Sequence, residues 1–77
     1  MREFNIDIRS LQQIRDFVRL AAVQPFEVVV GNHHQTINGK DLMGMYVLDY
    51  SRPVQVSVRC SEDEFCRFRQ NVLALTA

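Results

Sequence analysis

The sequence lacks the features that mark several specialised classes of protein. Its two cysteines in 77 residues are too few for a disulfide scaffold. Nine basic and nine acidic side chains cancel, so the chain offers no excess positive charge for binding nucleic acid. It has no signal-peptide pattern and no apolar run long enough to cross a bilayer. We therefore expect a cytoplasmic globular protein with no nucleic-acid or membrane partner.

Side chains that carry metal or nucleophile chemistry are also scarce. The spacing of His33, His34, Cys60 and Cys66 matches no standard zinc pattern. The sequence places no carboxylate or arginine to serve the histidines, and no Ser/His/Asp or Cys/His set can be assembled. We interpret the cysteines as buried or half-buried thiols and the histidines as solvated turn residues. The sequence thus predicts no catalytic residue, no metal ion and no cofactor.

The N-terminal part of the chain predicts a strand and then a helix. Apolar and polar residues alternate from Glu3 to Arg9, as in a strand with one buried face. Ser10 and Gln13 fit a capping box at a helix start, and Pro25 ends the helix because it disfavours helical backbone in the preceding residue. The residues expected to face the core are Leu11, Ile14, Phe17, Val18, Ala21 and Ala22.

The middle of the chain predicts a hairpin and a short helix. Strands are expected over 26–30 and 35–37, and turn chemistry favours Gly31-Asn32 at the hairpin tip. Asp41 lies where its carboxylate could cap a helix over 40–48, in which Met43 falls off the apolar stripe and is expected to be exposed. The residues of this helix expected to face the core are Leu42, Met45 and Leu48.

The C-terminal part predicts another strand and a final helix. Valines alternate with polar residues over 54–59, and Ser61 with Glu64 fits a second capping box. The order β-α-β-β-α-β-α over residues 1–77 predicts a single α+β domain, an open-faced sandwich of one four-stranded antiparallel sheet with three helices on its apolar face. The expected core positions of the last helix are Phe65, Phe68, Val72 and Leu75.

One segment of the sequence resembles a known family. Residues 40–48 read Lys-Asp-Leu-Met-Gly-Met-Tyr-Val-Leu, which is similar to the regulatory segment of the histidine-containing phosphocarrier proteins (HPr) of the bacterial sugar phosphotransferase system. The resemblance implies an HPr-like fold, and the family's regulatory serine falls on Asp41. Counting back from this segment places the hairpin tip at His33-His34 instead, so two registers remain open.

The chain departs from the family where phosphoryl transfer takes place. The family needs a histidine beside an arginine at the start of the first helix, where helix N–H groups bind the phosphoryl oxygens. Alignment of the first helix puts Ser10 at the histidine position and Gln12 at the arginine position. We therefore expect a divergent member that is not an enzyme and does not carry a phosphoryl group.

The resemblance implies a function in protein binding. The expected partner is another protein, such as a transcriptional regulator or a component of the phosphotransferase system. Asp41 either mimics a phosphoserine weakly or only caps the helix, and both interpretations stay open. The residues expected to form the binding surface are Gln12, Gln13, Arg15, Asp41, Met43, Tyr46 and Val47.

Two other functions remain as alternatives at this stage. The first is a phosphocarrier that uses a relocated histidine, His33 or His34. The second is an unrelated ferredoxin-like module for ligand binding or dimerisation, because β-α-β-β-α-β is also the element order of that fold. The order of the strands in the sheet distinguishes the second from an HPr-like fold.

Overall fold

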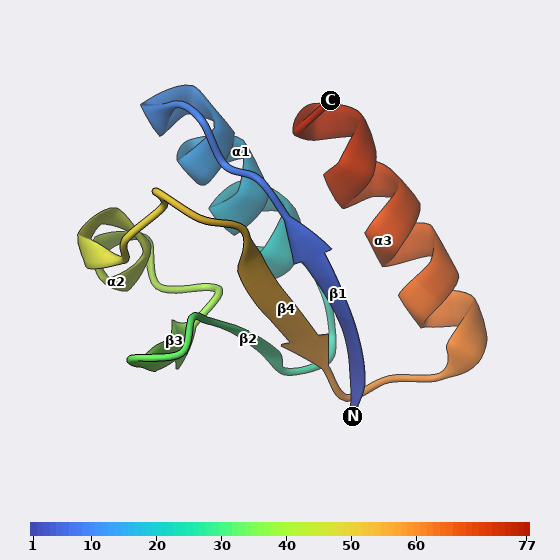
Figure 1. Cartoon of the computed structure of the whole chain (residues 1–77). Coiled ribbons are helices and arrows are strands. Elements are labelled where there is room, and N and C mark those ends of the chain that lie inside the picture. Colours follow the sequence, from blue (N-terminus) through green and yellow to red (C-terminus); the bar gives the residue numbers. More distant parts are fainter.

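The computed structural model describes residues 1–77 and contains one sheet and three helices (Figure 1). Their order is the predicted β-α-β-β-α-β-α. The elements are β1 (Arg2–Ile6), α1 (Leu11–Ala22), β2 (Val28–Gly31), β3 (Thr36–Asn38), α2 (Leu42–Val47), β4 (Val54–Val58) and α3 (Glu62–Leu75). No helix among them is long and apolar enough to span a membrane.

The four strands pair in the order β1-β4-β2-β3, and every pair is antiparallel. The last strand, β4, thus lies between β1 and β2. A ferredoxin-like sheet instead has its third strand between the first two, so the ferredoxin-like alternative is wrong. The predicted α+β open-faced sandwich is confirmed.

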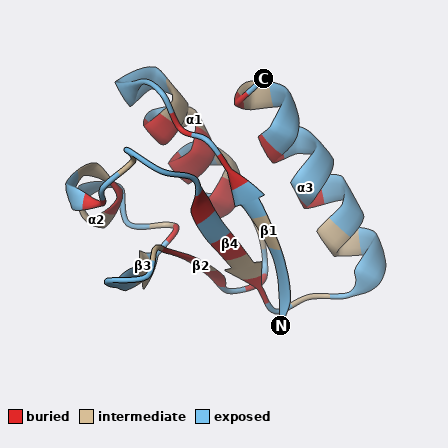
Figure 2. Ribbon diagram, viewed as in Figure 1, coloured by how far each residue is buried: buried red, intermediate tan, exposed pale blue.

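The core lies between one face of the sheet and the helices. The side chains of Val54, Val56 and Val58 alternate inward from β4 and are almost completely buried. Phe17 of α1 and Phe68 of α3 cover them from the helical side and are equally buried. Figure 2 shows the buried residues on the inner sides of α1, α3 and the sheet, while the outer sides of the helices are exposed. This arrangement matches the predicted period-two and helical patterns.

Gly39 lets the chain pass close to the core between β3 and α2. Its backbone N–H donates to the carbonyl of Val28 over 2.8 Å. A Cβ atom at Gly39 would lie 2.7 Å from Val28 Cγ1, which is closer than such atoms approach, and 3.3 Å from Phe17 Cε1, which is a tight contact. The absence of a side chain at Gly39 is therefore what places the start of α2 beside the sheet.

The apolar stripes end earlier than predicted. Leu11, in the first turn of α1, is 63% exposed, and Ala22 in the last turn is also exposed. Leu42 is 37% exposed at the start of α2, and Leu48 is buried but follows the helix in extended conformation. Helical spacing predicts which side of a helix is apolar, but not how far the neighbouring layer extends to cover it.

The helix starts differ in how completely they are capped. Ser61 forms the full predicted capping box with Glu64, whose pKa is lowered by the hydrogen bonds that its carboxylate accepts from Ser61. At α1, Ser10 Oγ accepts from the Gln13 N–H, but Gln13 Oε1 accepts from the N–H of Arg9 over 2.6 Å. The predicted box at α1 is therefore half formed, with its second bond shifted by one residue.

These caps predict the stability of two serine variants. Ser10→Ala and Ser61→Ala should each cost roughly 1 kcal/mol of unfolding free energy, because each leaves a backbone donor without its acceptor. In a domain of this size, thermal unfolding should then shift down by about 4–8 °C per kcal/mol. Ser51→Ala is the matched control, since Ser51 Oγ caps no helix. Unchanged melting of both cap variants would contradict the assigned helix starts.

Candidate functional site

The predicted binding residues come from α1 and α2, which pack against each other. Arg15 of α1 donates from Nε to the hydroxyl of Tyr46 in α2 over 3.0 Å. This bond raises the pKa of the Arg15 guanidinium, which is charged at any physiological pH. It holds together two segments that are 31 residues apart in the sequence. The exposed surface formed by Gln12, Arg15, Met43, Tyr46 and Val47 is called here the α1/α2 surface.

Two apolar side chains stand out on this surface. Met43 is 71% exposed and Val47 is 72% exposed, although both belong to a helix whose Met45 is completely buried. Met43 and Val47 are four residues apart and therefore lie on the same side of α2. The predicted exposure of Met43 is confirmed. The two side chains form a small apolar area with no partner within the chain.

The two glutamines of the predicted surface differ in their surroundings. Gln12 is exposed and donates from Nε2 to Asp16 Oδ1 over 2.9 Å. Gln13 is half-buried, and its side-chain oxygen accepts the N–H of Arg9 at the start of α1. Gln12 is thus available to a partner, whereas Gln13 stabilises the helix start.

Asp41 precedes α2 but does not cap it with its side chain, contrary to our expectation. Its ψ angle is 105°, compared with 159° at Ser10 and 166° at Ser61, where the side chains do cap. At this angle the carboxylate makes no hydrogen bond with the first helical N–H groups, although it lies near Gly44 in the first turn. The backbone carbonyl of Asp41 still accepts from Met45 N over 3.0 Å. Asp41 therefore carries a free, exposed negative charge beside the α1/α2 surface.

The Asp41 carboxylate is the nearest neighbour of the glycine in this short helix. A Cβ atom on Gly44 would lie 3.0 Å from Asp41 Oδ2 and 3.4 Å from its Cγ. Glycine thus leaves room for the carboxylate over the first turn of α2. Sequence propensities give no reason for a glycine here, because the contact depends on the backbone angle of Asp41.

The start of α1, where the family's phosphohistidine would lie, faces an apolar recess of 470 Å³. Its apolar lining comes from Ile8, Leu11, Ile14 and Tyr50, its polar lining comes from Arg9 and Ser10, and no histidine lines it. Burial raises the pKa of Tyr50 to about 12, and its hydroxyl donates to the carbonyl of Met45. The Ser10 hydroxyl accepts a hydrogen bond from the N–H of Gln13 and therefore caps the start of α1.

The two histidines form the tip of the β2–β3 hairpin. The N–H of Asn32 donates to the carbonyl of Gln35 over 3.0 Å, which closes the turn around His33 and His34. Asn32 Oδ1 also accepts from the N–H groups of His34 and Gln35. The tip is therefore His33-His34, and the register with Gly31-Asn32 at the tip is wrong.

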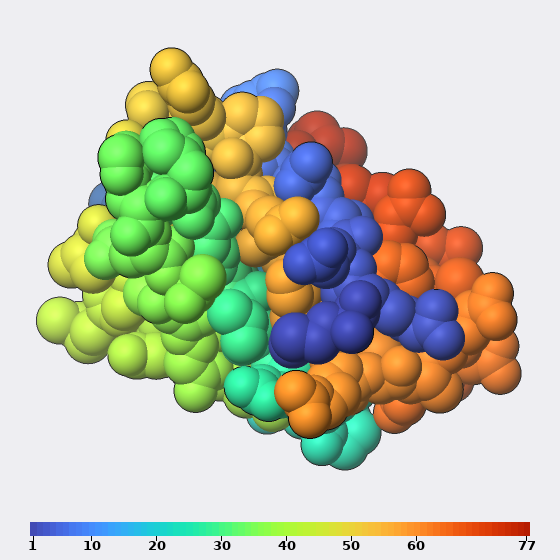
Figure 3. Space-filling model, turned by 60° about the horizontal axis from the view of Figure 1, so that its bottom comes forward, coloured from blue at the N-terminus to red at the C-terminus, as the bar shows by residue number.

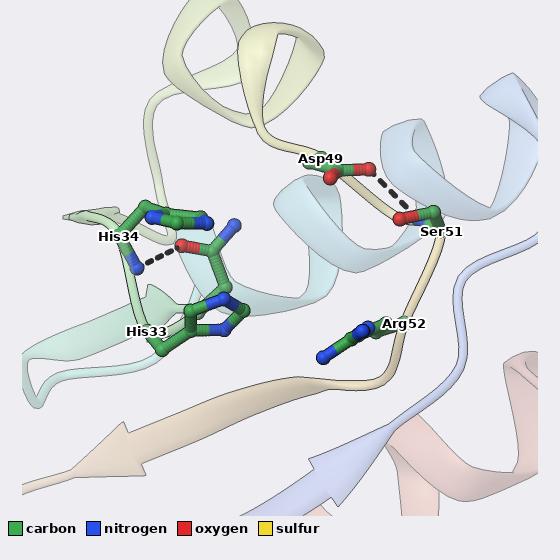
Figure 4. A pocket seen from close by; sticks show the side chains of 6 residues that line it. His33, His34, Asp49, Ser51 and Arg52 are labelled. Atoms are coloured by element: carbon green, nitrogen blue, oxygen red, sulfur yellow. Dashed lines mark hydrogen bonds between the residues drawn. The ribbon is translucent and has the colours of Figure 1, made fainter.

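Charged side chains do lie beside the histidines, which corrects the sequence-based expectation. Figure 4 shows His33, His34, Asp49, Ser51 and Arg52 around one pocket of 260 Å³, with Arg52 extending toward His33. The pKa of Asp49 is lowered, mainly by its hydrogen bonds with Ser51 and further by His34 and Arg52. The chain contains no group of three or more His, Cys, Asp or Glu side chains that could hold a metal ion.

The sheet order and the three covering helices define an open-faced α+β sandwich. One solved protein with this fold is HPr-C-His from Thermoanaerobacter tengcongensis, which superposes with a TM-score of 0.79. The match is 22% identical and covers 99% of this chain and 91% of that one. The fold is therefore HPr-like. No family model matches this chain, and no curated protein matches it.

The contact between Asp41 and Gly44 predicts the effect of a methyl group there. Gly44→Ala should stabilise the protein by up to about 1 kcal/mol, because alanine favours helix and the free Asp41 carboxylate can rotate away. Urea unfolding of Gly44→Ala and of Asp41→Ala/Gly44→Ala measures this. If Gly44→Ala is destabilised and the double variant is not, the carboxylate is fixed in place and the prediction is wrong.

Proposed function

We propose that this chain is a non-catalytic HPr-like protein that acts by binding another protein. The partner would be a transcriptional regulator or a component of the sugar phosphotransferase system, and binding would have a regulatory role. The contact would centre on the α1/α2 surface. The observation that carries this proposal is the pair of exposed apolar side chains, Met43 and Val47, on a helix held to α1 by the Arg15–Tyr46 hydrogen bond.

The physical argument rests on the surroundings of these two apolar side chains. An exposed methionine adapts its shape to a partner, and apolar side chains rimmed by polar ones are typical of binding surfaces. Arg15 and Asp41 supply opposite charges at this rim, and neither is in an ion pair within the chain. A partner that places an apolar side chain against Met43 and pairs with one of these charges would fit the surface.

A second feature supports binding in place of phosphoryl transfer at the start of α1. The Ser10 hydroxyl caps the helix, and the recess beside it is lined mainly by apolar side chains. A phosphoryl group carries two negative charges and needs donors or cations around it. Arg9 is the one cation that lines the recess, and it already pairs with Asp7 over 3.6 Å. The remaining lining suits an apolar side chain of a partner, which would extend the proposed contact beyond α2.

The proposal predicts that a charge in the apolar pair abolishes binding. Met43→Lys should remove partner binding and leave the fold intact, because lysine would put an unpaired charge into the contact. Partners are isolated with the wild-type chain and identified by mass spectrometry, and the experiment is repeated with the variant. Leu73→Lys on α3 is the control, since it adds the same charge at another exposed apolar position. Equal recovery by folded Met43→Lys would overturn the proposed surface.

Asp41 variants refine the same test. Because the Asp41 side chain caps nothing, Asp41→Ser and Asp41→Ala should both leave the melting temperature nearly unchanged. Both should weaken partner binding, since each removes the negative charge at the rim. If binding is unaffected by either change, the charge of Asp41 has no part in recognition.

The surroundings of His33 and His34 favour a second candidate, a phosphocarrier with a relocated histidine. Arg52 could bind phosphoryl oxygens there. Asp49 lies close enough to His34 for the histidine to contribute to the lowered pKa of the Asp49 carboxyl. We place this candidate second because both rings are exposed at a hairpin tip and no helix start faces them. The two candidates are mutually exclusive, because a non-catalytic protein would carry no phosphoryl group.

Incubation with Enzyme I and phosphoenolpyruvate separates the two candidates. We expect the mass of the protein to stay unchanged, with an active phosphocarrier as the positive control. An acid-labile gain of one phosphoryl group would overturn the non-catalytic proposal. Loss of that gain in His33→Ala or His34→Ala would then identify the acceptor.

A further inference from the structure

A polar hollow lies between the β2–β3 hairpin and the connection from α2 to β4. None of the residues that line it is hydrophobic. A second hollow of 320 Å³ shares Asn32, His33 and Arg52 with the first and continues onto the open face of the sheet beside Asn5 and Gln55. Figure 3 shows the hairpin in green next to the connection in gold. We call the first hollow the histidine pocket.

Arg52 is the side chain of the histidine pocket that is best suited to bind an anion. Its guanidinium takes part in no hydrogen bond or ion pair, since the single ion pair of the chain joins Arg9 to Asp7. Arg52 is exposed and extends into the space between the two segments (Figure 4). A guanidinium offers five N–H donors in a planar arrangement that matches two oxygens of one oxyanion.

The hairpin supplies further donors to the same space. Asn32 Oδ1 is occupied by the N–H groups of His34 and Gln35, which fixes the plane of the side-chain amide. The Nδ2 group of that amide has no acceptor within the chain and remains a donor at the pocket. The rings of His33 and His34 lie 4.0 Å apart between centroids and form no hydrogen bond with the protein. Each neutral ring still carries one N–H donor.

Asp49 is the acidic side chain of the pocket, and it limits what the pocket can hold. Its Oδ1 accepts from Ser51 N over 2.9 Å, and this bond contributes to the lowered pKa that keeps the carboxylate ionised. The charge of Asp49 opposes that of Arg52, so an anion gains affinity mainly through direct contact with Arg52 and the neutral donors. The donors outnumber the acceptors, which argues for an oxyanion and against a cation.

We propose that the histidine pocket is a binding site for a small tetrahedral oxyanion of the phosphate type. Arg52 holds two oxygens of the anion, and the Asn32 amide with the His33 and His34 rings donates to the others. Asp49 weakens binding by repulsion and restricts it to anions that reach the Arg52 side of the pocket. The site is separate from the α1/α2 surface and does not depend on the proposed function.

The test is a titration of the ¹⁵N-labelled protein with inorganic phosphate, followed by NMR at constant ionic strength with chloride as the balancing anion. Saturable shifts should appear at the backbone amides of His33, His34 and Ser51. Arg52→Gln should weaken binding about tenfold, as for loss of a charged hydrogen-bonding partner. Arg69→Gln on α3 removes the same charge at a remote exposed site and should leave the affinity unchanged.

Removing the negative charge of Asp49 should have the opposite effect on phosphate binding. Asp49→Asn keeps an oxygen that accepts the Ser51 N–H but removes the negative charge, so phosphate should bind more tightly to this variant. A non-saturable titration of the wild type would overturn the proposal. It would also be overturned if Arg52→Gln bound phosphate as tightly as the wild type or if Asp49→Asn bound it more weakly.

Discussion

The packing around Phe68 is the interaction on which the rest of this structure depends. Its ring is almost completely buried and meets those of Phe4, Phe17 and Phe26 edge to face, with centroids 6.2, 6.2 and 5.6 Å apart. These rings come from β1, α1 and the segment before β2. One side chain of α3 therefore packs against three separate parts of the chain. In a chain this short the buried surface is limited, and such a central contact carries much of the stability.

This core determines which side chains of the helices remain exposed. It fixes α1 and α3 over the sheet and leaves α2 attached at the side through Gly39, Met45 and the Arg15–Tyr46 bond. The apolar side chains that the core cannot cover remain exposed at the outer side of α2. A separate group of polar residues lines the pocket between the hairpin and the connection to β4.

The HPr-like fold does not by itself decide the function of the chain. A fold positions side chains, and the chemistry follows from which side chains occupy those positions. At the start of α1 the chain has a capping serine and a mainly apolar recess that Arg9 also lines, and it lacks the imidazole that phosphohistidine transfer would need. A larger group of polar donors lies around Arg52, at a different place in the fold.

The sequence by itself determined the element order, the buried faces and the helix start at Ser61, because these follow from local periodicity and capping chemistry. Only the tertiary structure decided that Leu11 is exposed and that Asp41 caps nothing, since the first depends on the extent of the sheet and the second on one backbone angle. It also decided that Arg52 and His33 line the same pocket. That arrangement joins residues far apart in the sequence, and no local pattern encodes the folding of one loop against another.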